Sequence, residues 1–207
     1  MTTAIIGTGG LGSVIARLLA SGGEPLRLSS ADPAAARTLA EQIGPAAVGA
    51  DDNGDAVRGA GAVVLALRFT VLEGVIADIA GSLTDKVVVV PSNPLTTDAQ
   101  GRVSRVLPSG ESSGHVVAGW LPEGACLAMA FGSMSAGLLE SSSRRSPDPA
   151  ALFYASDDRA AAEVERLIRA AGFEPVSIGG VERSDRLEVG GDLHDVVLAP
   201  DEARATV

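Results

Sequence analysis

The chain has 207 residues, a formal net charge of −10, 46% hydrophobic residues and only 3% aromatic residues. This length suits one domain, or one domain with a small appendage. The negative charge argues against nucleic acid or an anionic membrane as a partner, and a single cysteine excludes an internal disulfide framework. No hydrophobic run approaches the ~18–20 residues that span a bilayer, and no signal peptide is recognisable, so we expect a cytoplasmic protein.

The first half of the chain alternates predicted strands and helices. Short β-branched or apolar runs predict strands at residues 2–6, 25–29, 61–67 and 86–91. Apolar residues at helical spacing predict helices at residues 11–21, 34–43 and 70–80, with a short acidic helix at 52–58. Asp32 is expected to cap the second of these helices, with Pro33 in its first position. The alternation predicts an α/β fold with a doubly wound, mostly parallel sheet.

The second half is less regular. Residues 100–114 are rich in Gly, Ser and Pro and predict a long surface loop, and residues 141–149 predict a second exposed loop. Strands are expected at 125–131, 151–156 and 174–179, with a strongly amphipathic helix at 157–172. We therefore expect one domain, with a core over about 1–131, a small α/β extension over about 132–190, and a polar tail over 191–207.

Residues 7–12 predict a phosphate-binding loop. Gly7-Thr8-Gly9-Gly10-Leu11-Gly12 fits the pattern G-x-G-x-x-G and lies between a predicted strand and an amphipathic helix. In such loops the first glycine permits the tight turn, the second lets the backbone approach a pyrophosphate, and the third brings the helix close to the strand. The helix N-terminus then offers free amides to the anion. The alternative interpretation is an ordinary tight turn between strand and helix.

The end of the second predicted strand bears on which dinucleotide would bind. Ser29 lies 22 residues after Gly7, where sites selective for NAD usually place an acid on the ribose 2′-hydroxyl. Ser29 and Ser30 would not repel a 2′-phosphate as a carboxylate would, which favours NADP over NAD. The alternative is that the two serines only begin the turn.

These features, with stretches further along the chain, resemble one known family, the NADP oxidoreductases that use the deazaflavin coenzyme F-420. The matching stretches are IIGTGGLGSVIARLLASGG, LSSADPAAA, DKVVVVPSNPLT, LAMAFGSMSAGLL and YASDDRAAAEVERLIRAAGFEPVSIGGVERSDRLE. They cover most of residues 4–188 in the family's order, and NPLT and AGFEPVSIG are the more specific of them. The resemblance implies a Rossmann domain with a small C-terminal extension, NADP in the glycine loop, and a homodimer.

The resemblance also implies roles for individual residues. Residues 8–11 would wrap the pyrophosphate, and Ser29 and Ser30 would meet the 2′-phosphate. The residues that would border the nicotinamide half are Leu67, Asn93 and Ala130.

Two positions depart from the family pattern. The family usually has a basic residue directly after the serine of the turn, where this chain has Ser30. Arg27 or Arg37 could substitute for it, although strand alternation and helix phase could equally point them elsewhere. The family's asparagine after Ala-Phe is replaced by Gly132, which removes a partner of the nicotinamide.

No catalytic acid or base is expected, because hydride transfer between two stacked rings needs mainly orientation. His115 is expected on the surface of a helix. His194, with Asp192 and Asp195, is expected in a solvated segment, because three residues without a fourth partner rarely form a metal site. Cys126 is expected in the core.

Arg68 is the residue most worth following outside the glycine loop. It comes directly after a buried strand, at the carboxyl edge of the sheet where ligands of open α/β sheets bind. It could hold a cofactor phosphate or a substrate carboxylate, or be exposed without a ligand. Arg102 and Arg105 are further cations that could attract the phosphate and glutamyl tail of F-420.

The leading functional hypothesis is an oxidoreductase that transfers a hydride between NADP(H) and F-420 or another flavin-like acceptor. Dehydrogenases and imine reductases share the N-terminal domain but normally need a large helical domain, and only 29 residues follow Ile178. A third hypothesis is a sensor or scaffold that binds NADP without turnover.

Overall fold

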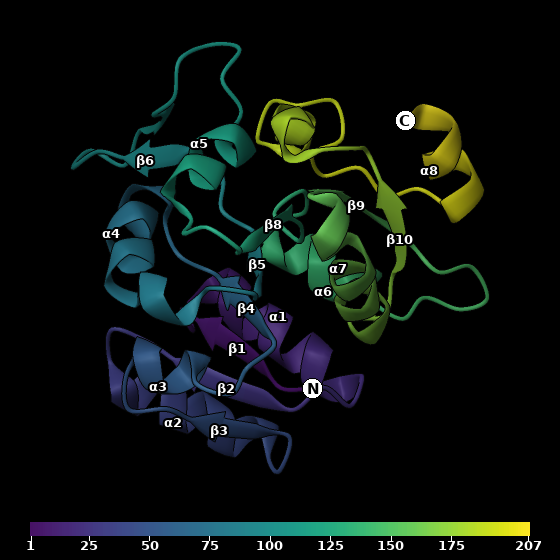
Figure 1. The fold of residues 1–207 in the computed structure, drawn as a ribbon. Helices are drawn as coiled ribbons and strands as arrows, with labels where there is room; N and C mark the ends of the chain where they lie inside the picture. The colour runs from purple at the N-terminus through teal and green to yellow at the C-terminus, as the bar shows by residue number, and fades with distance from the viewer.

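The computed structural model describes residues 1–207, and its main feature is an eight-stranded sheet (Figure 1). The strand order is β10-β9-β8-β5-β4-β1-β2-β3. These strands are β1 (Thr3–Ile6), β2 (Leu26–Ser29), β3 (Ala47–Gly49), β4 (Ala62–Leu65), β5 (Val87–Val90), β8 (Cys126–Met129), β9 (Ala151–Ser156) and β10 (Glu174–Ser177). All neighbours are parallel except β8 and β9, which are antiparallel. The predicted mostly parallel, doubly wound α/β fold is confirmed.

Helices cover both faces of this sheet. The helices are α1 (Gly10–Ser21), α2 (Pro33–Ile43), α3 (Asn53–Val57), α4 (Phe69–Ile79), α5 (Ser113–Trp120), α6 (Ala136–Ser142), α7 (Asp158–Ala170) and α8 (Pro200–Thr206), with short 3₁₀ helices at Ala80–Ser82 and Val181–Leu187. One hydrophobic core packs α1, α2, α6 and α7 on one face, and a second packs α3, α4, α5 and α8 on the other. No helix is both long and apolar enough to cross a lipid bilayer.

The two cores follow from the alternation of side chains along buried strands. In β1, Ile5 contributes to one core while Ala4 and Ile6 contribute to the other, and at most 1% of each residue is exposed. Helix ends follow local chemistry as well. The Oδ1 atom of Asp32 accepts a hydrogen bond from the Ala34 amide at 2.9 Å, so the predicted cap of α2 is confirmed.

The C-terminal part of the chain extends the sheet. Strand β9, helix α7 and strand β10 follow each other, and β10 pairs parallel to β9 at one edge. In Figure 1 this unit lies at the opposite side of the sheet from β2 and β3. Gly172 follows α7 with φ +90°, a conformation that favours glycine and ends the helix.

Several predicted segments are different in the structure. The predicted loop at 100–114 contains β7 (Val103–Arg105), which pairs antiparallel with β6 (Leu95–Thr97) to form a hairpin, here called the β6–β7 hairpin. The predicted polar tail is also folded, because α8 forms there and both Leu193 and Ala203 are buried. Strand β3 and helix α6 were not predicted, since each is short and has little apolar periodicity of its own.

Candidate functional site

The glycine loop joins β1 to α1 and has two kinds of glycine. A Cβ at Gly7 would collide with the carbonyl oxygen of Ala66, and Gly7 has φ +100°. A Cβ at Gly12 would collide with the carbonyl oxygen of Gly7, so these two glycines let strand and helix pack closely. Positions 9 and 10 differ, because a Cβ there would meet no atom within 4 Å. Those two positions leave open space above the loop, as a bound pyrophosphate requires.

That space belongs to a cleft of about 600 Å³ at the carboxyl edge of the sheet. Four segments contribute to it: the glycine loop, the residues after β4, the residues after β5, and the β6–β7 hairpin. Its lining residues are Gly9, Gly10, Leu11, Gly12, Ala66, Leu67, Arg68, Phe69, Thr70, Pro91, Ser92, Asn93, Leu95, Thr96, Thr97 and Val103. The structure therefore brings together seven residues predicted from the sequence: Gly9, Gly10, Leu11, Gly12, Leu67, Arg68 and Asn93.

Two helix N-termini without side-chain caps face the cleft. The N-cap of α1 is Gly9 and that of α4 is Arg68, and neither side chain caps its helix. Helices α2, α3 and α5 are capped by Asp32, Asp52 and Ser112, whereas α6 and α7, which do not line the cleft, also lack a side-chain cap. Free amides at a helix N-terminus carry a partial positive charge and bind anions. Two such ends beside one cleft favour a ligand with at least one phosphate.

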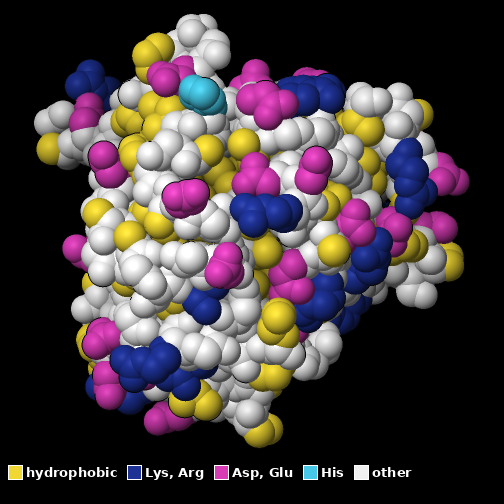
Figure 2. All heavy atoms as spheres, in the orientation of Figure 1, with side chains coloured by type: hydrophobic (Ala, Val, Ile, Leu, Met, Phe, Trp, Pro, Cys, Tyr) yellow, Lys and Arg dark blue, Asp and Glu magenta, His cyan; other side chains and the backbone are white.

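The charge of the cleft differs from that of the whole chain. Arg68 is the one charged residue among the lining residues, and no carboxylate lines the cleft. The chain as a whole carries −10, and on the face shown in Figure 2 acidic and basic side chains are interspersed. An anionic ligand in the cleft would thus meet a local positive charge without a competing negative one.

The end of β2 lies directly beside the glycine loop. The carbonyl oxygen of Ser29 accepts a hydrogen bond from the Gly7 amide at 2.8 Å. The Ser29 side chain is buried, and its hydroxyl donates to the Asn53 Oδ1 atom at 2.7 Å. This bond orients Asn53, a residue that the sequence analysis did not single out. Ser30 is half-buried at the same edge and has no comparable side-chain bond to a neighbouring element.

The two arginines considered near this end have acidic partners. Arg27 donates to the Asp55 carbonyl oxygen and pairs with the Asp55 carboxylate at 2.9 Å. Arg37, on α2, approaches the Asp51 carboxylate at 3.5 Å and is half-exposed. Arg27 is therefore held in place, whereas Arg37 has a single long contact and is freer to accept another anion.

The other end of the cleft is built around Asn93. Its Nδ2 atom donates to the Gly132 carbonyl oxygen at 2.9 Å, and its Oδ1 atom accepts from the Val189 amide at 2.6 Å. Phe131, before Gly132, has φ +67° although it is fully buried, a conformation that is costly for an aromatic residue. A Cβ at Gly132 would collide with the carbonyl oxygen of Pro91, so the close approach of two chain segments requires glycine there.

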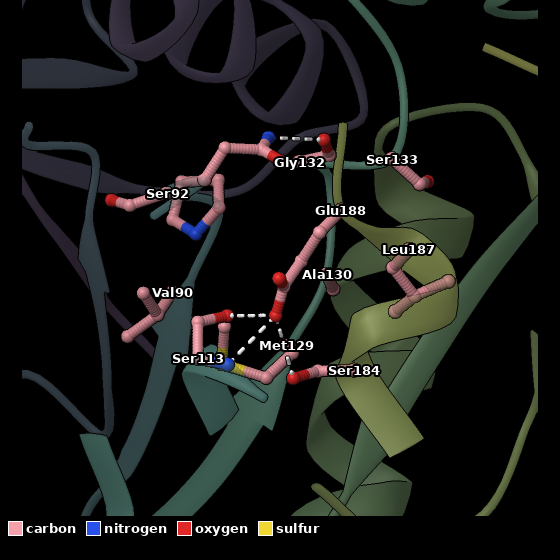
Figure 3. A pocket seen from close by; sticks show the side chains of 12 residues that line it. Val90, Ser92, Ser113, Met129, Ala130, Gly132, Ser133, Ser184, Leu187 and Glu188 are labelled. Atoms are coloured by element: carbon pink, nitrogen blue, oxygen red, sulfur yellow. Dashed lines mark hydrogen bonds between the residues drawn. The ribbon is translucent and has the colours of Figure 1, made fainter. Parts of the chain in front are cut away.

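A small second cavity adjoins the cleft and shares Pro91, Ser92 and Asn93 with it (Figure 3). Its volume is about 10 Å³, which is the size of a single water. Ala130, predicted to border the nicotinamide, lines this cavity instead of the main cleft and is 2% exposed. The Ser133 hydroxyl on its wall is buried and has no hydrogen-bond partner.

The same cavity contains a buried carboxylate that the sequence analysis missed. Glu188 is 4% exposed, and its Oε1 atom accepts from the Ser113 amide at 2.7 Å and from the Ser113 hydroxyl at 2.6 Å. Its Oε2 atom accepts from Arg105 Nη1 at 2.5 Å, as an ion pair. No local pattern marks Glu188, because its partners lie at least 75 residues away in sequence, except Ser184.

The remaining candidates lie elsewhere. Arg102 pairs with Asp98 at 2.7 Å in the β6–β7 hairpin, and the hydrogen bonds from the Arg102 amide and guanidinium lower the pKa of Asp98. His115 is exposed on α5 and Cys126 is buried in β8. No group of three or more His, Cys, Asp or Glu side chains is arranged to hold a metal ion.

Residues 2–94 match the model of a protein family described as NADP oxidoreductase, coenzyme F-420-dependent. This match contains the glycine loop, both serines, Arg68 and Asn93, and it confirms the resemblance over that part of the chain. A comparison with curated protein sequences finds no significant match.

Solved structures show the same fold along nearly the whole chain. A hypothetical protein from Sinorhizobium meliloti is 24% identical with a TM-score of 0.84, over 97% of this chain and 96% of its own. A candidate F-420-dependent NADP reductase from an Arthrobacter species is 24% identical with a TM-score of 0.74, over 87% and 86% of the two chains. A reductive aminase from Aspergillus terreus in complex with NADPH is 17% identical with a TM-score of 0.63, over 94% of this chain and 58% of its own.

Proposed function

With residues 2–94 matching the F-420-dependent NADP oxidoreductase family, we propose that the protein is an NADP-dependent oxidoreductase acting on a deazaflavin or other flavin-like acceptor. The observation that carries the proposal is the cleft itself. It combines a glycine cradle, two helix N-termini without side-chain caps, and one cation with no carboxylate beside it. These are the features that bind the pyrophosphate of a dinucleotide.

The chain offers a residue for each part of the cofactor. The amides at the start of α1, with Gly9 and Gly10 leaving room above them, would bind the pyrophosphate. Ser30, with Arg37 of the following helix α2, would meet the 2′-phosphate, while Ser29 would act indirectly by orienting Asn53. The residues that would border the nicotinamide are Leu67, Arg68 and Asn93 in the cleft and Ala130 in the adjoining cavity.

The expected chemistry makes few demands on side chains. A bound nicotinamide supplies or accepts the hydride, and the protein's task is to hold the two rings face to face and exclude water. The Asn93 side chain makes one bond to the Gly132 carbonyl oxygen and one to the Val189 amide, which suits it to orienting the backbone there. Arg68 is exposed at the cleft and is the group best placed to meet an anionic part of either ligand.

A two-step experiment tests the proposal. NADPH and NADH are first titrated separately by fluorescence, and oxidation of NADPH is then measured with F-420, with free flavins and with quinones. We expect micromolar binding of NADPH, weaker binding of NADH, and turnover with F-420 or a flavin. Absence of micromolar binding of either nucleotide would overturn the proposal.

Binding without turnover would favour the sensor or scaffold hypothesis.

Arg68→Ala distinguishes a contact with NADPH from a contact with the acceptor. The variant weakens NADPH binding if Arg68 meets the cofactor. It raises the acceptor KM alone if Arg68 meets the acceptor. Arg159, an exposed arginine of α7 remote from the cleft residues, provides the matched control as Arg159→Ala.

A further inference from the structure

The β6–β7 hairpin forms one wall of the cleft but lies outside the eight-stranded sheet. Leu95, Thr96, Thr97 and Val103 contribute to the cleft lining together with the glycine loop. Most of the hairpin is exposed, and Val103 is 62% exposed. In Figure 1 the hairpin lies beside α4 and α5, away from the main sheet. Its position therefore depends on contacts at its base.

The end of the hairpin is held by a buried carboxylate. Arg105 is the last residue of β7, and its Nη1 atom donates to Glu188 Oε2 at 2.5 Å. Its Nη2 atom donates to the Glu111 carbonyl oxygen at 2.6 Å. Glu188 is itself fixed by Ser113 at the start of α5 and by the Ser184 hydroxyl at 3.3 Å. Figure 3 shows the bonds from Ser113 and Ser184 converging on the Glu188 carboxylate.

The start of the hairpin is held by Val189, the residue after Glu188. The Val189 amide donates to Asn93 Oδ1 at 2.6 Å, and the Asn93 carbonyl oxygen accepts from the Leu95 amide at 2.8 Å. The dipeptide Glu188–Val189 thus contacts both ends of the hairpin. Loss of the Glu188 carboxylate would leave Arg105 without its anionic partner and release the end of the hairpin. The bond to Asn93 comes from the Val189 backbone and would remain.

We propose that Glu188 is a positioning residue for the hydride acceptor, acting through Arg105 to hold the β6–β7 hairpin as the acceptor's side of the cleft. This rests on the proposed function, since it takes the glycine loop as the dinucleotide side. The hairpin follows directly after Asn93, at the end of the cleft opposite the serines of β2, so it borders the space where the second ligand would stack. The dinucleotide pyrophosphate, at α1, would not depend on Glu188.

Glu24 provides a matched control. It is also 4% exposed and pairs with an arginine, Arg166, at 2.5 Å, and it accepts from the Thr3 hydroxyl at 2.5 Å. It precedes β2, so it lies at the amino edge of the sheet, away from the cleft. Glu24→Gln and Glu188→Gln therefore remove the same kind of buried charge at sites that differ in their relation to the cleft.

The test compares these two variants by proteolysis and by kinetics. Trypsin can cut after Arg102, which lies beside the hairpin strand and is 78% exposed. We expect Glu188→Gln to accelerate cleavage after Arg102 and to raise the KM for F-420 by about fivefold to tenfold each, as loss of a charged hydrogen bond implies. The Kd for NADPH should change by less than about twofold, because distant sites act independently. Glu24→Gln should lower Tm without either effect.

Equal cleavage of the two variants at Arg102, or parallel changes in NADPH Kd and acceptor KM, would overturn the proposal. If Glu188→Gln does not fold, Arg105→Ala removes the same ion pair through its half-exposed partner. Compared with Arg105→Ala, Arg105→Lys should restore part of the protection against cleavage after Arg102. Cleavage is measured without ligand, so it decides the role of Glu188 in holding the hairpin even if NADPH does not bind. Failure of NADPH binding would count against the proposed function separately.

Discussion

Under the proposed function, single residues at the end of β2 would distinguish NADP from NAD. The sequence suggests Ser29 and Ser30 equally, but the structure separates them, because the Ser29 hydroxyl is buried against Asn53. Ser30 remains half-buried at the edge, with no charge of its own, and Arg37 is the cation with the weakest existing partner. Under the proposed function, a preference for NADP would therefore depend on position 30 more than on position 29.

Substitution at position 30 tests this assignment. Ser30→Arg adds a guanidinium where a 2′-phosphate would lie, and should tighten NADPH binding about tenfold with little change for NADH, as a charge-assisted bond implies. Ser30→Asp should shift the preference toward NADH, since a carboxylate repels the phosphate. Separate titrations of the two nucleotides measure the ratio. An unchanged ratio in both variants would mean that residue 30 does not face the ribose.

At the scale of elements, long amphipathic segments were predictable and short ones were not. Helix α7 and strands β1, β4 and β5 are each close to their predicted positions, because apolar periodicity or a continuous apolar run identifies them locally. Strand β7 lies in the segment predicted as a loop and β6 was not predicted, since the two strands have three residues each and pair only with each other. Helix α8 was predicted as tail, and tertiary burial of Ala203 explains why it folds.

In the candidate site too, residues within one short motif were predictable and residues far apart in the sequence were not. The glycine loop was identifiable because one short motif contains all of its glycines. The hydrogen-bonded group of Glu188, Ser113 and Arg105 was not identifiable from the sequence. These residues meet only when α5, the β6–β7 hairpin and the second 3₁₀ helix fold together. The replacement of the family's asparagine by Gly132 was visible in the sequence. The close approach of Pro91, which leaves no room for a side chain at position 132, required the structure.

The N-terminus of α1 yields a prediction at the element scale. Gly10 in α1 and Gly74 in α4 are both helical, and a Cβ at either would meet no atom within 4 Å. Gly10→Ala and Gly74→Ala should both fold and gain up to about 0.5–1 kcal/mol, because alanine restricts the unfolded chain. Only Gly10→Ala should weaken NADPH binding, by about tenfold, because its methyl group crowds the pyrophosphate. Thermal unfolding and NADPH titration check both variants.

Equal NADPH affinity of Gly10→Ala and wild type would show that no ligand approaches the start of α1. A large loss of Tm in either variant would contradict the open space seen around both glycines.

At the scale of the whole molecule, one sheet joins the N-terminal and C-terminal halves. Strand β8 pairs with β5 on one side and with β9 on the other, and α1 contacts both α6 and α7. Glu24, before β2, pairs with Arg166 of α7 and joins the two halves again. Burial opposes ionisation of Glu24, but the hydrogen bonds from Arg166 and Thr3 outweigh it and lower its pKa. These links predict that the halves unfold together.

The single tyrosine and the single tryptophan of the chain allow that expectation to be measured. Tyr154 lies in β9, and burial together with its hydrogen bond to Glu165 at 2.7 Å raises the pKa of Tyr154 to about 12. Below pH 10 the Tyr154 phenol is neutral in both the folded and the unfolded chain. Its full contribution to the free energy of unfolding is therefore present there. That contribution, of order 2 kcal/mol, is lost as the pH rises from about 10 to 12. Tyr154→Phe should therefore lose less stability than wild type over this range.

Trp120, in α5 on the other face of the sheet, reports on a distant part of the molecule. In wild type at alkaline pH, tyrosinate absorbance and Trp120 fluorescence should change over the same pH range if the chain unfolds as one cooperative unit. Titration of Tyr154 near pH 10 in the folded protein would show that its phenol is not shielded. Separate transitions at the two probes would instead show that β9, α7 and β10 unfold apart from the rest of the sheet, because cooperativity would then stop at the antiparallel pairing of β8 and β9.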